Sequence, residues 1–181
     1  NEHLFERLSI PNINVARRFQ GLKSNYNYFT SYEAKTCKTF FSEDYIKRLN
    51  NPTKKTKFIM EFVFKDMTRT VFEKNIIKGT IRGAFCLIIA HKNNTNINNL
   101  ITFEKKIKSI NFVHSEIWSK KEKQNVKISK EESLRGEDNK FSNCLYLEFT
   151  NSNDVLLAMD NAIRNFSEAE IGSYQLISTL T

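Results

Sequence analysis

The sequence has few of the residues that bend, break or cross-link a polypeptide. Its 181 residues include five glycines, two prolines and three cysteines. So little glycine and proline argues against collagen-like or linker-rich designs, and against a glycine-rich loop that would hold nucleotide phosphates. The longest apolar run, Ala84–Ala90, is far shorter than the roughly 20 residues that a membrane-spanning helix needs. We therefore expect no membrane partner.

The cysteines are too scattered to form a motif. Cys37, Cys86 and Cys144 include no CxxC pair, and each lies in a stretch that we predict to be a strand. This pattern favours reduced, buried thiols in a cytoplasmic protein over a disulfide or a metal site. The sequence also has no signal peptide and no P-loop, Rossmann, zinc-finger or serine-hydrolase signature. We expect a cytoplasmic location, no metal and no cofactor, but these absences do not decide whether the protein is an enzyme.

What the sequence does contain is apolar material and positive charge. Apolar residues make up 40% of the chain and include 15 phenylalanines, enough to form a packed core. Lysine and arginine outnumber the acidic residues by 28 to 20, which gives a net charge of +8. Such a charge permits binding to nucleic acid. Because the charges are spread along the chain, we favour a solvated surface over a polyanion site.

The second half of the chain has the element order of a ferredoxin-like unit. Leu145, Leu147 and Phe149 alternate with other residues in the pattern of a half-buried strand. The predicted elements are strands at 84–90, 112–118, 144–150 and 171–180, and helices at 97–110 and 153–166. We predict that the charged stretch 119–143 is a long loop. Residues 80–181 therefore follow the βαββαβ order.

The first half repeats this order without its opening strand. Its predicted elements are a helix that ends at Leu8, strands at 13–20, 31–41 and 67–77, and helices at 43–49 and 52–64. We therefore predict an α+β fold in which two ferredoxin-like units pack as an intrachain dimeric α+β barrel. The units would span residues 1–79 and 80–181. Either residues upstream of Asn1 or another segment would supply the missing strand.

Several segments of the first half resemble one family. They are residues 2–11 (EHLFERLSIP), the strand residues 16–19, and residues 42–45, 49–53 and 67–72. Together they are similar to the EthD-like and stress-responsive branch of the dimeric α+β barrel proteins. The sequence departs from that pattern at Phe5, where proline is usual, and at Asn12, where glycine is usual. Beyond residue 72 the resemblance lies only in the order of elements.

The resemblance implies a fold and a class of function. Two sheets would face each other with the helices outside, and a small apolar or aromatic molecule would bind within; a homodimer is a candidate assembly. The family includes cofactor-free monooxygenases, isomerases, haem-handling enzymes and proteins without known activity. We expect a small-molecule-handling protein, for example a monooxygenase, isomerase or lyase acting on an aromatic or enolisable compound. The alternatives are a non-catalytic ligand-binding or assembly module and an RNA-binding protein.

Two histidines are candidate site residues. The histidine of the family's first helix corresponds to His3, which the resemblance makes the candidate catalytic base for an acidic phenol or enol. The alternative is a structural histidine bonded to a neighbouring strand. His114 shares a strand face with Glu116 and Trp118, where it would flank a ligand or be satisfied locally. We predict that His91 lies at the surface.

Aromatic and basic residues complete the candidate ligand-binding set. Tyr28 and Tyr32 belong to an aromatic cluster that would cover a ligand or anchor a loop. Arg17 and Arg69 are expected on neighbouring strands. Pointing inward, they would neutralise a carboxylate or phenolate; pointing outward, they would only solubilise an edge.

One segment of the sequence favours RNA binding. Residues 82–88, RGAFCLI, partly resemble the sheet motif of RNA-recognition domains, which also have the βαββαβ order. However, Ala84 and Ile89 stand where that motif needs base-stacking aromatic rings. A strand buried on both faces also could not present bases. We therefore do not expect nucleic acid as the partner.

Overall fold

The computed structural model describes residues 2–64, 67–93, 95–108, 110–122, 128–135 and 140–181. Within these residues the chain forms seven strands and six α-helices. The helices are α1 (Glu2–Leu8), α2 (Glu43–Asn50), α3 (Lys54–Phe62), α4 (Ile97–Lys106), α5 (Lys130–Arg135) and α6 (Ser152–Asn165), with a 3₁₀-helix, η1, at Cys37–Phe41. The strands are β1 (Ile13–Lys23), β2 (Tyr28–Ala34), β3 (Phe72–Lys78), β4 (Phe85–His91), β5 (Phe112–Lys120), β6 (Asn143–Phe149) and β7 (Glu170–Leu180).

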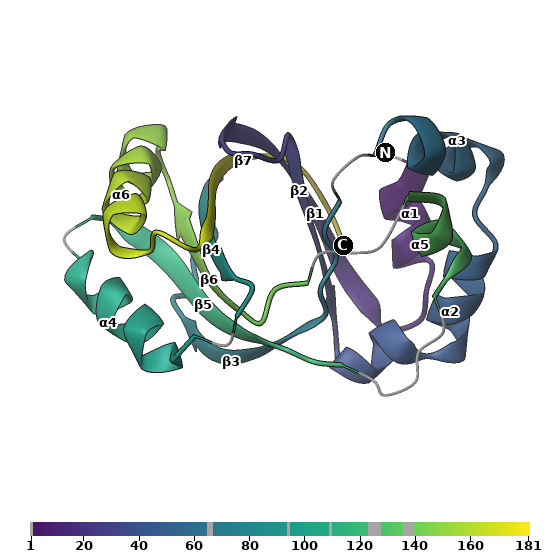
Figure 1. Ribbon diagram of the computed structural model, residues 1–181, viewed down its shortest axis with the longest axis horizontal. Helices are drawn as coiled ribbons and strands as arrows, with labels where there is room; N and C mark the ends of the chain where they lie inside the picture. Colours follow the sequence, from purple (N-terminus) through teal and green to yellow (C-terminus); the bar gives the residue numbers. More distant parts are fainter. Residues whose placement is uncertain (1, 65–66, 94, 109, 123–127, 136–139) are drawn as a thin grey trace.

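All seven strands belong to one curled sheet. Their order is β2-β1-β7-β4-β6-β5-β3, and every neighbouring pair is antiparallel. The sheet is strongly curled and the helices lie outside the curl, with α4 and α6 on one side and α1, α2, α3 and α5 on the other (Figure 1). The predicted α+β class, with helices outside the sheet, is confirmed. The two separate facing sheets are not, because β1 pairs with β7 and β3 pairs with β5.

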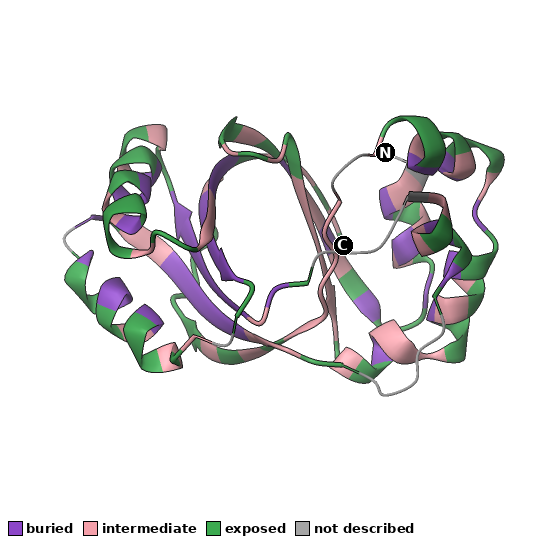
Figure 2. Ribbon diagram, in the orientation of Figure 1, coloured by how far each residue is buried: buried purple, intermediate pink, exposed green. Residues whose placement is uncertain are grey.

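The central strands are buried on both faces. On the outer face, Leu145, Leu147 and Phe149 of β6 pack under α4 and α6, in a core that also contains Leu100 and Val155. On the inner face, the alternate residues of β6 join an aromatic core inside the curl. Figure 2 shows β4, β5 and β6 buried along most of their length. The prediction of a half-buried strand at 144–150 is therefore wrong, since side chains fill the inside of the curl as well.

A second group of helices covers the outer face of β1 and β2. Ile10 and Ile13 pack there against Tyr45 and Leu49 of α2. The charged stretch predicted as a loop contributes helix α5 to this layer, where Glu131 forms a buried ion pair with Arg7 of α1. Within the described residues, no helix has the length and apolar character needed to cross a membrane.

Three local predictions are wrong: the end of the strand at 31–41, the placement of Cys37 in that strand and the surface position of His91. The strand predicted at 31–41 ends at Ala34, and the 3₁₀-helix that follows contains Cys37. This helix leads directly into α2, whose N-terminus is capped by the Ser42 side chain. Cys86 and Cys144 do lie in strands, and all three thiols are free. His91, predicted at the surface, is buried, and its ring packs edge-on against Phe166 at 5.3 Å.

Candidate functional site

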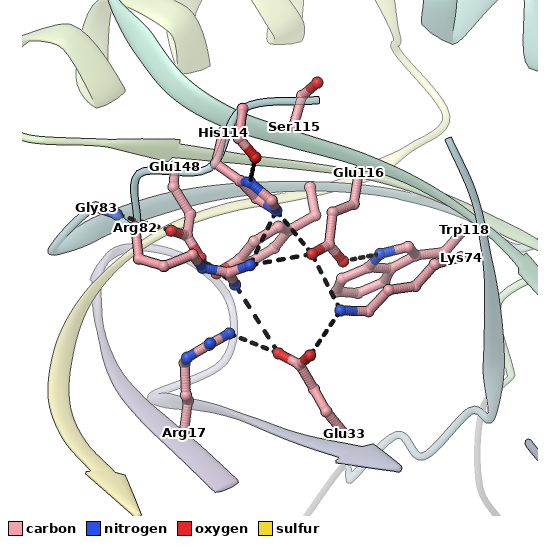
Figure 3. Close-up of polar contacts among 12 residues, drawn as sticks. Arg17, Glu33, Lys74, Arg82, Gly83, His114, Ser115, Glu116, Trp118 and Glu148 are labelled. Atoms are coloured by element: carbon pink, nitrogen blue, oxygen red, sulfur yellow. Dashed lines mark hydrogen bonds and ion pairs between the residues drawn. The ribbon is translucent and has the colours of Figure 1, made fainter. Parts of the chain in front are cut away.

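The inner face of the sheet carries a cluster of charged side chains, shown in Figure 3. We call it the barrel network. Its members are Arg17, Glu33, Lys74, Arg82, His114, Glu116, Trp118, Tyr146 and Glu148. The two-residue period of a strand places alternate residues of β5 and β6 on this face, while their neighbours pack under the helices.

Glu116 is the most heavily bonded carboxylate of the barrel network. Its Oε1 lies 2.7 Å from His114 Nε2, 3.0 Å from Lys74 Nζ and 3.2 Å from Arg82 Nη1. Its Oε2 accepts a hydrogen bond from Trp118 Nε1 at 2.7 Å. Burial by itself would raise the pKa of Glu116, but these hydrogen bonds and the charge of Lys74 outweigh it and lower the pKa to about 2. Glu116 is therefore held as a carboxylate.

Glu148 is held in a similar way on the next strand. It accepts hydrogen bonds from the Tyr146 hydroxyl and, at 2.7 Å, from the backbone N–H of Gly83, and it lies 2.6 Å from Arg82 Nη2. A Cβ atom on Gly83 would come within 2.3 Å of the Phe149 carbonyl oxygen. The Arg82-Gly83 pair, which resembles the start of an RNA-binding motif, therefore serves here to hold Glu148.

The Nε2 atom of His114 lies between a hydrogen-bond acceptor and a hydrogen-bond donor. Its Nδ1 is 2.8 Å from the Gly79 carbonyl oxygen, and because a carbonyl only accepts, Nδ1 is assigned as a donor. Its Nε2 lies 2.7 Å from a Glu116 oxygen and 2.9 Å from Arg82 Nη1. A protonated Nε2 would donate to Glu116, whereas a neutral Nε2 would accept from Arg82. The 2.7 Å contact with Glu116 is a hydrogen bond only when Nε2 carries a proton; in the neutral ring Arg82 is the partner of Nε2, and the Glu116 oxygen would have to move away from the Nε2 lone pair.

Glu33 is the third carboxylate, and it comes from an end strand of the sheet. Its Oε1 lies 2.6 Å from Arg17 Nη1 and 3.9 Å from Arg82 Nη2, and its Oε2 lies 2.8 Å from Lys74 Nζ. Burial opposes the ionised form, but the hydrogen bond and charge of Lys74, followed by the charge of Arg17, lower the pKa of Glu33. Three cations thus meet at one carboxylate.

Exposure changes across the barrel network. The side chains of Glu116 and Glu148 are each 1% exposed, whereas those of Glu33, Lys74 and Arg82 are 27%, 29% and 33% exposed. An aromatic wall adjoins the buried part: the rings of Trp118 and Tyr146 stack at 5.0 Å, and Phe72 lies 5.6 Å from Trp118. The site therefore has a buried acid–base part and a cationic part that reaches solvent.

Some of the predicted site residues meet here. Arg17, His114 and Trp118 belong to the barrel network, so the inward orientation considered for Arg17 is the observed one. Arg69 lies in the segment that precedes β3, the strand at the opposite end of the sheet from β1 and β2. The prediction that Arg17 and Arg69 lie on neighbouring strands is wrong, because four strands separate β1 from β3.

The remaining predicted residues lie on the outer side of the sheet. Tyr28 is exposed at the start of β2 and packs against the Arg18 guanidinium at 5.0 Å. Tyr32 packs with the cluster under α1 and α2, and burial raises the pKa of its hydroxyl. His3 lies on α1 with its Nδ1 3.7 Å from Glu6. These contacts of the three residues are all with residues outside the barrel network.

Five residues of the barrel network were missed in the sequence: Glu33, Lys74, Arg82, Tyr146 and Glu148. For Glu148 a signal existed, because a glutamate that alternates with Leu147 and Phe149 in a strand rich in apolar residues points away from the helices. For Glu33 and Lys74 no sequence signal could be found, since they are far apart in the chain and meet only when the sheet curls.

Two open hollows lie elsewhere on the surface of the described residues. One of about 430 Å³ lies between the turn after β1 and the end of α6, with Lys23 and Phe166 in its wall. Another of about 410 Å³ lies between Pro11 and α2. The barrel network lines neither of them. The described residues also bring together no group of histidine, cysteine and carboxylate side chains suited to a metal ion.

Comparison with known proteins adds no relative. No family model matches the chain, and neither a curated protein nor a solved structure matches it.

Proposed function

We propose that this protein binds a small anionic or enolisable molecule at the barrel network and transfers a proton to or from it through His114. The observation that carries this proposal is the position of His114 Nε2 between a carboxylate, Glu116, and a guanidinium, Arg82. A group that gives and takes a proton needs both of its protonation states to be stabilised. Glu116 would stabilise the imidazolium and Arg82 the neutral ring.

The assigned role of Arg82 is to stabilise the negative charge that forms on the substrate. Its guanidinium also contacts Glu148 and extends towards solvent, so it lies between the buried acid–base part and the partly exposed part of the site. An enolate or phenolate oxygen beside this guanidinium would receive charge-assisted hydrogen bonds. Proton transfer of this kind needs no additional reactant, because the proton passes between the substrate and the imidazole.

The experiment that tests this proposal is solvent deuterium exchange. The protein is incubated in D₂O with acetoacetate, methyl acetoacetate, 2-oxobutanoate and phenylpyruvate, and ¹H NMR follows the loss of the hydrogens next to the carbonyl groups. We expect at least one compound to exchange faster with the wild-type protein than with His114→Gln. His91→Gln serves as the matched control, because His91 is also a buried histidine on the sheet. Equal rates with wild type and His114→Gln for the whole panel would overturn the proposal.

We also propose that the curled sheet consists of two ferredoxin-like units, as in EthD-like and related dimeric α+β barrel proteins. The order β7-β4-β6-β5 supports this for the second half: each β-α-β segment joins two parallel strands with one antiparallel strand between them. In the first half, β1, β2 and β3 would be the second, third and fourth strands of the other unit. The pairs β1–β7 and β3–β5 would then join the two units at both edges.

A further inference from the structure

We propose that the ligand of the barrel network carries a carboxylate and that Glu33 occupies the position of this carboxylate when the ligand is absent. This inference rests on the proposed function of the same site and names the class of its ligand. It begins from a difference among the three carboxylates of the network.

Glu116 and Glu148 are built into the fold. Each of them accepts hydrogen bonds from uncharged donors as well as from cations: Trp118 Nε1 for Glu116, and Tyr146 and the Gly83 backbone for Glu148. Both belong to inner strands and are almost fully buried. Displacing either carboxylate would leave buried donors without an acceptor, at considerable cost.

The contacts of Glu33, in contrast, are of the kind that the carboxylate of a bound ligand would make. The contacts that the structure gives its carboxylate are all with cationic side chains: Arg17 from one neighbouring strand, Lys74 from the other end of the sheet, and Arg82 at longer range. It is the most exposed carboxylate of the network, and it lies on an end strand. Rotation of its side chain towards water would therefore expose a charge that water can solvate.

Charge complementarity indicates what would replace it. With a neutral His114 ring, Arg17, Lys74 and Arg82 carry three positive charges, which Glu33, Glu116 and Glu148 balance. When Glu33 leaves, one positive charge remains unbalanced at the part of the site that reaches solvent. A ligand carboxylate has the same planar shape and two acceptor oxygens, so it fits between Arg17 and Lys74 as Glu33 does.

The position of Arg82 limits the size of the ligand. One guanidinium nitrogen lies 2.9 Å from His114 Nε2, and the other lies 3.9 Å from Glu33 Oε1. The carboxylate position and the proton-transferring nitrogen are therefore bridged by a single guanidinium group. A short carboxylic acid with its acidic hydrogen a few bonds from the carboxylate, such as an oxo acid, would reach both.

Isothermal titration calorimetry of Glu33→Gln against wild type tests the proposal. The probes are acetoacetate and benzoate as carboxylates, methyl acetoacetate as the uncharged counterpart, and inorganic phosphate as another anion. We expect the Kd of at least one carboxylate to fall by about tenfold or more in Glu33→Gln, because its internal competitor is gone. Methyl acetoacetate should gain nothing, and phosphate should gain less than the carboxylate.

Two further variants keep the result interpretable. Glu73→Gln removes an exposed carboxylate that pairs with Lys121 and should give no gain, so it controls for net charge alone. Arg17→Gln should weaken carboxylate binding, and it provides a second test should Glu33→Gln fold poorly. The proposal is overturned when neither carboxylate gains affinity in a folded Glu33→Gln, or when phosphate gains equally. If deuterium exchange persists in either of these cases, the proposed proton-transfer function still holds, and only the proposal that the ligand carries a carboxylate is wrong.

Discussion

Lys74 joins the two ends of the sheet through Glu33. Glu33 lies on β2 and Lys74 on β3, the end strands of the seven, and their carboxylate and ammonium groups are 2.8 Å apart. The same ammonium lies 3.0 Å from Glu116 on β5. Side chains thus connect the sheet ends inside the curl. Separately, the Cys37 thiol of η1 donates to the Phe72 carbonyl oxygen of β3. Stability and the proposed site therefore depend on the same lysine.

Lys74→Met should destabilise the protein. The substitution keeps most of the side-chain volume but removes a hydrogen-bond donor from the buried Glu116, and we expect a loss of about 1–3 kcal/mol in the free energy of unfolding. Chemical denaturation measures it. Lys23→Met is the control, because Lys23 and Asp160 form an exposed ion pair that should be worth less than about 1 kcal/mol. Equal effects of the two substitutions would show that Lys74 contributes only surface charge.

Glu116 should make the protein sensitive to acid. Its folded-state pKa of about 2 lies below the ordinary value of 4.5, so its contribution to stability is complete above pH 4.5 and is lost as the pH falls towards 2. A difference of this size corresponds to about 3 kcal/mol. Denaturation measured at several pH values should give a shallower pH dependence for Glu116→Gln than for wild type. Glu33, whose pKa is also lowered, leaves part of the slope in the variant.

Leu147→Ala should show that β6 is central to the core under α4 and α6. Leu147 is fully buried there, so we expect a loss of about 2–5 kcal/mol in the free energy of unfolding. Leu157→Ala, at an exposed position of α6, should cost much less. A loss below about half a kcal/mol for Leu147→Ala would contradict the register described for β6.

The buried pair Arg7–Glu131 should hold α5 against α1. Burial would lower the pKa of Arg7, but the charge of Glu131 raises it above its ordinary value, so the guanidinium keeps its charge. Glu131→Gln leaves the Arg7 charge buried without its partner, and we expect a loss of about 3–5 kcal/mol. Replacing both residues, Arg7→Met with Glu131→Leu, should recover most of it. A double variant no more stable than Glu131→Gln would argue against a buried pair.

His3→Ala tests the residue that the family resemblance singles out. His3 lies on α1 beside Glu6, outside the barrel network, and its side chain is partly exposed. We expect unchanged deuterium-exchange rates and a change in melting temperature of only a few degrees, because no buried contact of the network is lost. A loss of exchange comparable to that of His114→Gln would indicate that the active site lies at α1 and not at the barrel network.

Local patterns in the sequence were enough to predict most elements of the fold. The order of strands and helices after residue 84 follows from hydrophobic periodicity, and the strand face that Leu147 and Phe149 share was correctly expected to be buried. Periodicity predicted the face that carries His114, Glu116 and Trp118. It gave a wrong result where packing overrides it: η1 replaces the end of a predicted strand, and His91 is covered by Phe166.

The sequence by itself determined which residues alternate and therefore which ones share a face of a strand. Only the tertiary structure decided which faces meet. Glu33 and Lys74 are separated by 41 positions, and Arg82 and Glu148 by 66, yet all four gather around one site because the sheet curls until its ends approach. The energetic reason is the burial of carboxylates, which requires cations from other strands to neutralise them, and no local pattern records where those cations will come from.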